Sequence, residues 1–132
     1  MEDGDVCTWV VEAKPEKIKV TVKNVKLELF IADTDSSRAR GLMGVDYLGE
    51  NEGMIFFWPS AGKKCMWMKN TNLPLSVAFI DQDRTIVQIN DLQPLSTESV
   101  CSRSERIIAA IEMNKDWFEE NDLKEGSQVN LN

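Results

Sequence analysis

Hydrophobic and polar residues alternate along much of the chain, which is typical of β-strands with one buried face. The alternation runs through residues 18–22, pauses at Lys23-Asn24, and resumes at residues 25–31 in the opposite phase. Asn accepts the positive φ that tight two-residue turns demand, so this phase change predicts a β-hairpin. The chain therefore starts its regular pattern with an expected antiparallel strand pair.

Further segments predict additional strands. Met54 to Trp58 is a continuous apolar run closed by Pro59, as expected for a strand buried on both faces. Turn residues separate the segments at 75–81 and 85–90 and predict a second hairpin. The remaining strand candidates are residues 6–12, 65–69, 106–113 and 128–131.

Two short helices are expected, at about residues 34–43 and 114–121. The first begins in a run of Asp, Thr and Ser residues that can cap a helix, and Gly44 can end it. The second begins at Asn114, another capping residue. Short strands separated by turns, with few helices, predict a mainly β fold, either a β-sandwich or an open barrel.

The composition favours one acidic domain. The chain has 132 residues, enough to bury a core, and we expect a single domain over residues 1–132 with residues 1–5 disordered. The net charge of −7 repels phosphate backbones, so nucleic acid is not an expected partner. No stretch approaches the ~18 apolar residues of a membrane span. We expect a monomer.

Histidine is absent, and its absence removes several chemistries. There can be no Ser-His or Cys-His dyad and no imidazole base or zinc ligand. Cys7, Cys65 and Cys101 show no C-x-x-C spacing, so no metal site and no cofactor is expected. In an exported protein, Cys65–Cys101 is the first disulfide to consider, because it closes a loop worth about 4 kcal/mol in the chain-entropy model. Buried reduced thiols are the alternative.

A dense central run carries a family resemblance. Its segments are Arg40-Gly41-Leu42-Met43, Gly53-Met54-Ile55-Phe56, Trp67-Met68-Lys69-Asn70-Thr71, Leu73-Pro74-Leu75 and Ala78-Phe79-Ile80-Asp81. In order and spacing they resemble the domain-of-unknown-function family 192, a group of small bacterial and archaeal proteins often made with an export signal. The resemblance covers the chain from about Val20 onward. It implies a compact, mainly β fold with an early short helix, and it implies no activity.

The resemblance also bears on location and on two local features. Export of family members makes the periplasm or the extracellular space the expected location. The first five residues are acidic and lack the basic and apolar regions of a signal peptide, so this chain either begins after a removed leader or is cytoplasmic. Family members usually carry an acidic residue where this chain has Ser76, and an alanine-glycine turn near residues 114–116.

Candidate ligand-binding residues gather at the end of the strand expected at residues 65–69. Alternation places two methionines on one face and Trp67 and Lys69 on the other. If the methionine face enters the core, Trp67 and Lys69 point outward beside Asn70 and Thr71. An exposed indole beside amide and hydroxyl groups is suited to a sugar ring or another small polar ligand. The alternative is that Trp67 covers a core edge and the residues after Lys69 only form a turn.

Arg40 is the remaining candidate. Its guanidinium group can bind a carboxylate through two parallel hydrogen bonds. The alternative is an ion pair within the domain, for example with Asp81.

The sequence determines no function, and three hypotheses remain. The first is non-enzymatic binding of a small polar, saccharide-like ligand or a protein partner, through Arg40, Trp67, Lys69, Asn70 and Thr71. The second is a hydrolase or transferase acting on a saccharide-like substrate, for which no catalytic residue is assigned. The third is Cu(I) binding through methionines. The discriminating observation is whether the candidates line one concave surface, and whether two facing carboxylates share it.

Overall fold

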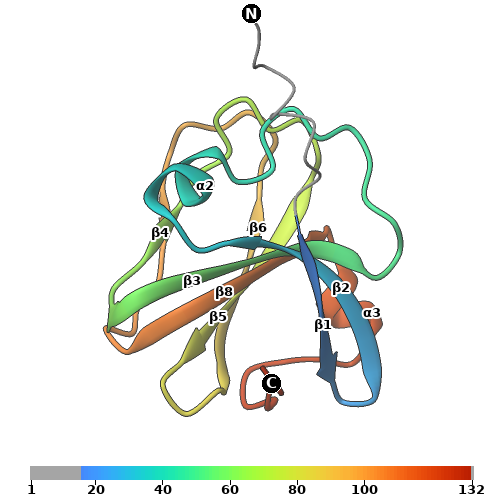
Figure 1. Cartoon of the computed structure of the whole chain (residues 1–132), viewed down its shortest axis with the longest axis vertical. Coiled ribbons are helices and arrows are strands. Elements are labelled where there is room, and N and C mark those ends of the chain that lie inside the picture. The colour runs from blue at the N-terminus through green and yellow to red at the C-terminus, as the bar shows by residue number, and fades with distance from the viewer. Residues whose placement is uncertain (1–15, 132) are drawn as a thin grey trace, which may run out of the picture.

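A six-stranded mixed sheet organises the protein (Figure 1). The computed structural model describes residues 16–131, so the strand expected at residues 6–12 and the disorder expected at residues 1–5 lie outside the described range. The strand order in the sheet is β1-β2-β3-β8-β5-β6, and only the β2–β3 pair is parallel. The strands are β1 (Lys17–Val22), β2 (Val25–Ala32), β3 (Glu52–Gly62), β5 (Leu75–Asp81), β6 (Ile86–Leu92) and β8 (Ile107–Asn114).

The remaining elements are a small ribbon and two helices. The ribbon pairs β4 (Cys65–Met66) with β7 (Val100–Cys101). The helices are α2 (Asp35–Arg40) and α3 (Trp117–Glu120), both shorter than the ranges the sequence indicated. The predicted mainly β fold with two short helices is confirmed, and the six-stranded sheet is open.

Both predicted hairpins are present. Lys23 and Asn24 have φ values of 52° and 71°, and the turn closes with Val22 paired to Val25. In the second hairpin, the Asp81 carboxylate accepts hydrogen bonds from the backbone N–H groups of Asp83 and Thr85. A side chain that satisfies turn N–H groups fixes the turn locally, which is why sequence pattern alone located it.

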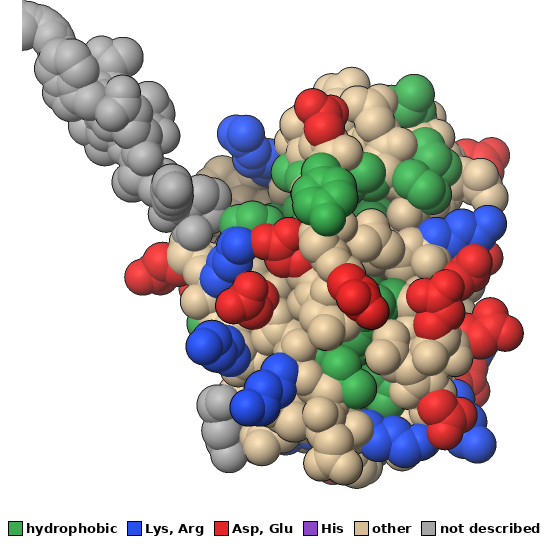
Figure 2. Space-filling view, turned by 90° about the vertical axis from the view of Figure 1, so that its right-hand side faces the viewer, with side chains coloured by type: hydrophobic (Ala, Val, Ile, Leu, Met, Phe, Trp, Pro, Cys, Tyr) green, Lys and Arg blue, Asp and Glu red, His purple; other side chains and the backbone are tan. Residues whose placement is uncertain are grey.

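Each face of the sheet covers its own hydrophobic core. On one face, α3 supplies Trp117 and Phe118 to a core that also contains Leu27, Ile55 and Ile111. The other face packs against the segment after α2 and against the β4–β7 ribbon; its buried residues include Leu42, Phe56, Met66, Met68 and Phe79. In Figure 1, α2 and β4 lie together at the left of the view, away from α3. The surface itself mixes charged and apolar side chains (Figure 2).

Several expected boundaries were wrong. The strand expected to close at Pro59 continues through it, since β3 ends at Gly62. The first helix ends at Gly41, not Gly44, because Gly41 already adopts the positive φ of 51° that leaves the helix. The strand expected at residues 65–69 stops after Met66, and residues 69–70 form a turn. The strand expected at residues 128–131 forms only single bridges.

The two departures from the family pattern lie next to each other. The Ser76 hydroxyl donates to Asp91 (3.1 Å) and accepts from the backbone N–H of Asp116 (3.0 Å). Asp116 has a φ of 70°, a left-handed conformation that favours glycine. In this chain an Asp residue adopts the left-handed backbone conformation that the glycine of an alanine-glycine turn would adopt more easily.

Gly53 in the central run is required by a close approach of β3 and β8. A Cβ atom at this position would lie 2.1 Å from the backbone oxygen of Glu112 and 2.4 Å from the sulfur of Met113. The backbone oxygen cannot move without breaking the β3–β8 pairing. A side chain at residue 53 would therefore separate the two central strands.

We predict that Gly53→Ala destabilises the protein by about 3 kcal/mol or more, because overpacking against backbone cannot relax by side-chain rotation. Gly62→Ala is the matched control on the same strand: its new Cβ would meet only the flexible end of Lys64, at 3.5 Å. Urea unfolding of both variants measures the difference. Equal stabilities of the two variants would contradict the role assigned to Gly53.

Candidate functional site

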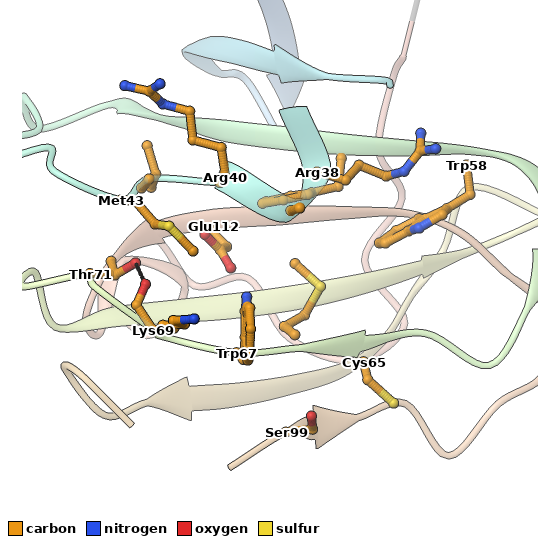
Figure 3. A pocket seen from close by; sticks show the side chains of 15 residues that line it. Arg38, Arg40, Met43, Trp58, Cys65, Trp67, Lys69, Thr71, Ser99 and Glu112 are labelled. Carbon is orange, nitrogen blue, oxygen red and sulfur yellow. Dashed lines mark hydrogen bonds between the residues drawn. The ribbon is translucent and has the colours of Figure 1, made fainter. Parts of the chain in front are cut away.

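A pocket of about 330 Å³ lies over the sheet face opposite α3. One wall comes from α2 and the turn that follows it, including Arg40 and Met43, and another from the segment after β4, including Trp67. Glu112 of β8 projects into the pocket from the sheet (Figure 3). Segments distant in the sequence therefore meet at one cavity.

Four of the five candidate residues line this pocket: Arg40, Trp67, Lys69 and Thr71. Asn70 does not line it. Asn70 has a φ of 57°, and its carbonyl oxygen accepts a hydrogen bond from the N–H of Gly44 at 3.2 Å. Its role is thus to join the turn after β4 to the turn after α2.

The alternation of buried and exposed side chains continues beyond β4, as the sequence predicted. Met66 and Met68 are buried in the core, whereas Trp67 is 42% exposed. The Lys69 ammonium group lies 5.4 Å from the centre of the Trp67 ring, a cation–π distance. Thr71 is buried, and its hydroxyl donates to the carbonyl oxygen of Lys69, so it stabilises the turn.

Two arginines of α2 line the pocket and differ in their partners. Arg38 donates to the backbone oxygen of Phe57 (2.6 Å) and pairs with Asp35 (2.7 Å), which fixes its side chain. Arg40 is exposed, and its guanidinium group has no hydrogen bond or ion pair within residues 16–131. The suggested ion pair with Asp81 is wrong, because that carboxylate belongs to the β5–β6 turn.

Glu112 is the functional candidate that the sequence analysis missed. It is 3% exposed, and among the described residues its carboxyl group has no hydrogen-bond partner. Its neighbours across the sheet are Met54 on β3 and Val77 on β5. Burial disfavours the charged form and raises the pKa of Glu112 to about 8, so the side chain is mainly neutral at pH 7. Figure 3 shows its oxygens directed into the pocket.

The number of carboxyl groups in the pocket distinguishes the binding hypothesis from the hydrolase hypothesis. Glu112 is the one acidic side chain that lines the pocket among residues 16–131. No group of three or more Cys, Asp or Glu residues in that range could hold a metal ion. The described pocket thus lacks the paired carboxylates of a standard glycosidase.

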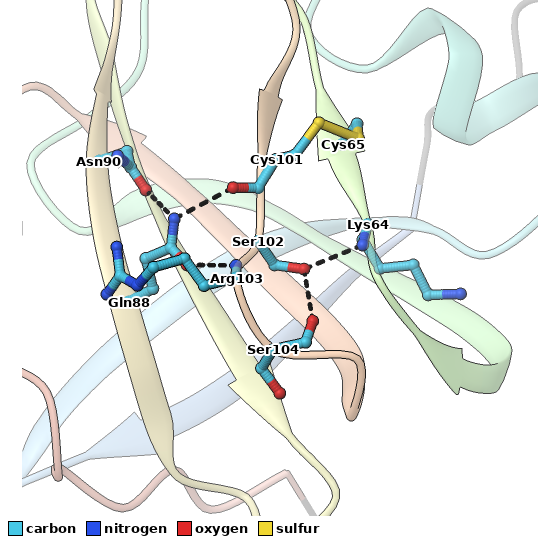
Figure 4. The surroundings of a disulfide bond; sticks show 8 residues. All are labelled: Lys64, Cys65, Gln88, Asn90, Cys101, Ser102, Arg103 and Ser104. Atoms are coloured by element: carbon cyan, nitrogen blue, oxygen red, sulfur yellow. Dashed lines mark hydrogen bonds between the residues drawn. A yellow bond between two sulfur atoms is a disulfide. The ribbon is translucent and has the colours of Figure 1, made fainter.

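A disulfide fastens the wall that carries Trp67 (Figure 4). Cys65 and Cys101 are bonded, with their Cα atoms 4.0 Å apart, and they join β4 to β7. Gln88 of β6 donates to the carbonyl oxygen of Cys101 (3.2 Å), which ties the ribbon to the main sheet. Two pairs of residues are too few to hold a ribbon alone. The disulfide therefore supports the pocket wall.

The fold and the pocket define a small, mainly β domain with one acidic side chain at the base of a cavity. Residues 17–131 match the domain-of-unknown-function family 192 (DUF192, Uncharacterized ACR), and the chain belongs to this family. The resemblance seen in the sequence motifs is thereby confirmed. No curated protein is significantly similar to the chain.

Two solved structures share the fold. One is a protein from Sinorhizobium meliloti 1021 described as a suggested transcription regulator, with 28% identity, a TM-score of 0.79, and coverage of 88% of this chain and 92% of that chain. The other is a protein of unknown function from Novosphingobium aromaticivorans DSM 12444, with 26% identity, a TM-score of 0.77, and coverage of 96% and 99%. Neither description gives a ligand. No helix within residues 16–131 is long and apolar enough to cross a membrane.

We predict that Glu112→Gln removes a pH-dependent loss of stability. The carboxyl pKa is about 8 in the folded protein and near 4.5 in the unfolded chain, so the folded state binds more protons between these values. The free energy of unfolding of the natural protein should therefore fall by about 1.4 kcal/mol per pH unit from this group as pH rises through that window. The advantage of the variant should grow from pH 4.5 to 8 and then level off.

Urea denaturation at several pH values measures this difference. Glu98→Gln is the matched control, since Glu98 is exposed and lies outside the pocket. Parallel pH profiles for the natural protein and Glu112→Gln would contradict the buried neutral state of Glu112.

We predict that replacing Cys65 and Cys101 together by serine lowers the free energy of unfolding by about 4 kcal/mol, because the bond closes a loop with a sequence separation of 36. Denaturation of the double variant measures the loss. Mass spectrometry of alkylated, unreduced natural protein should show both residues protected, and alkylation of both would refute the disulfide.

Proposed function

We propose that the protein binds a small polar ligand in the pocket beside Trp67 and does not convert it chemically. The observation that carries this proposal is that Arg40, Trp67 and Lys69, from two separate segments, line one cavity. An aromatic wall with a few polar groups is the usual equipment of a small-molecule site. The aromatic wall can cover an apolar face of the ligand while the cations bind its polar groups.

The dimensions of the pocket support a ligand of modest size. Its volume of about 330 Å³ lies at the lower end of the usual range for ligand pockets, roughly 300–1,000 Å³. A monosaccharide or a short peptide end fits this range, whereas a long polymer would have to extend along the surface. A small ligand is therefore favoured over a protein partner.

Hydrolysis of a saccharide-like substrate is the second hypothesis, and the pocket supports it less. Retaining and inverting glycosidases both need two carboxyl groups, about 5–10 Å apart. Among the described residues, the pocket offers Glu112 alone. A single neutral carboxyl group can hold a ligand but cannot supply both roles.

The description of the Sinorhizobium meliloti protein as a transcription regulator does not lead us to propose nucleic-acid binding for this chain. The net charge of this chain is −7, which disfavours contact with a phosphate backbone. On the face seen in Figure 2, acidic and basic side chains are interspersed and form no basic stripe.

We also propose that the protein works in the periplasm or outside the cell. The Cys65–Cys101 disulfide supports this proposal, since such bonds persist in oxidising compartments and are rare in the reducing cytoplasm. Fractionation of cells that express the native gene would test it, and recovery of the protein in the cytoplasm with reduced thiols would overturn it.

We predict that a ligand found by NMR titration with neutral sugars, acidic sugars and short peptides shifts the indole N–H signal of Trp67 and the amide of Lys69. The indole of Trp117 is the internal control, because it lies in the opposite core and donates to Asn51 at 3.0 Å. Trp67→Ala should weaken binding at least tenfold. Tyr47→Ala, an exposed aromatic residue outside the pocket, should leave binding unchanged.

Ligands whose shifts map elsewhere, or an affinity unchanged by Trp67→Ala, would place the binding site away from this pocket and overturn the proposal.

A further inference from the structure

Glu112 is an unusual group to find buried at the base of a cavity, between the apolar side chains of Met54 and Val77. It occupies the middle of the sheet, yet among the described residues nothing satisfies its carboxyl group. Buried polar groups are nearly always hydrogen-bonded, and leaving one without a partner costs free energy. A polar ligand group that enters the pocket would provide the missing partner.

The protonation state of Glu112 limits the identity of that ligand group. With a pKa of about 8, the empty pocket holds a neutral carboxyl group at pH 7, which can donate one hydrogen bond and accept others. A sugar hydroxyl group also both donates and accepts, so the two groups are complementary. An ammonium group would instead require a charged pair in a desolvated position, whose desolvation is costly.

Apart from Glu112 on β8, the charged groups that line the pocket are all cationic, and none of them lies on β8. They are Arg38 and Arg40 on α2 and Lys69 after β4; β3 and β5 place apolar Met54 and Val77 beside Glu112. Arg38 is already held by Asp35 and Phe57. In Figure 3 the Arg40 side chain points away from Glu112 and Lys69, whereas the Lys69 ammonium group lies beside Trp67. Lys69 is therefore the cation placed to bind an anionic group of a ligand inside the pocket, and a carboxylate matches it.

We propose that the pocket binds an acidic monosaccharide, whose carboxylate contacts Lys69 while one of its hydroxyl groups hydrogen-bonds to the Glu112 carboxyl group. Apolar C–H groups of the sugar ring contact Trp67 and Met43, which line the same cavity. The inference rests on the proposed binding function and adds the chemical class of the ligand. It also assigns Glu112 as a ligand-binding residue.

Binding of such a ligand depends on pH in a defined direction. Ionised Glu112 can only accept from the hydroxyl group and adds a second negative charge near the ligand carboxylate, so affinity should be constant below pH 7, fall as pH rises through about 8, and level off at a lower value.

The test compares three probes built on the same pyranose ring: glucuronate, glucose and glucosamine. Dissociation constants are measured at pH 6.5 from the Trp67 indole signal. Glucuronate should bind at least tenfold more tightly than glucose, and glucosamine more weakly than glucose. Lys69→Met should reduce glucuronate binding at least fivefold more than it reduces glucose binding. Lys115→Met, which removes an exposed lysine outside the pocket, is the charge-matched control and should affect neither probe.

Two variants of Glu112 test its assigned contact. Glu112→Gln keeps a donor and an acceptor, so it should retain glucuronate binding within about threefold and abolish the loss of affinity above pH 8. Glu112→Leu is one methylene shorter and has no polar atoms, and it should weaken all sugar binding at least tenfold. NMR spectra of the free variants confirm that each remains folded.

The outcomes separate this inference from the proposed function. Tightest binding of glucosamine, with release of a proton, would overturn the inference and leave the proposed function standing. The same holds if only peptides shift Trp67, or if Glu112→Leu binds glucuronate normally. If neither sugars nor peptides shift Trp67, both are overturned.

Discussion

The pairing of β8 with β3 on one side and β5 on the other places one strand at the centre of the sheet, and both cores are built on it. Ile111 faces the core under α3, and Ala110 faces the pocket side. The close approach at Gly53 keeps β8 tight against β3. Glu112 lies on β8, is 3% exposed, and lines the pocket. The chemistry of the site follows from this central position.

Local patterns were sufficient to predict much of this architecture. The turn at Lys23-Asn24 depends on backbone preferences of two residues, and the inside–outside order of Met66 and Trp67 depends on the two-residue period of extended chain. The sequence did not determine where α2 ends, because Gly41 and Gly44 both adopt positive φ and either could end a helix. Residue type alone could not decide between them.

Features that depend on non-local packing could not be predicted in the same way. The apolar run at residues 107–113 predicted a buried strand, but not which strands flank it or that one of its faces opens onto a cavity. A single glutamate inside that run was the available signal, since an acidic side chain is rarely buried without a purpose. Similarly, no local pattern distinguishes Arg38, which donates to the backbone oxygen of Phe57, from Arg40 on the same helix.

The pocket thus has two polar zones of different character. Arg40 and Lys69 carry charge where water still reaches them, while Glu112 lies where burial favours its neutral form. Burial is the cause of the raised pKa of Glu112. The proposed ligand, which spans both zones, presents an anionic end to one and a neutral hydrogen-bonding group to the other. This requirement restricts the identity of the ligand more than the cavity volume does, because many small molecules fit the volume and few present both groups.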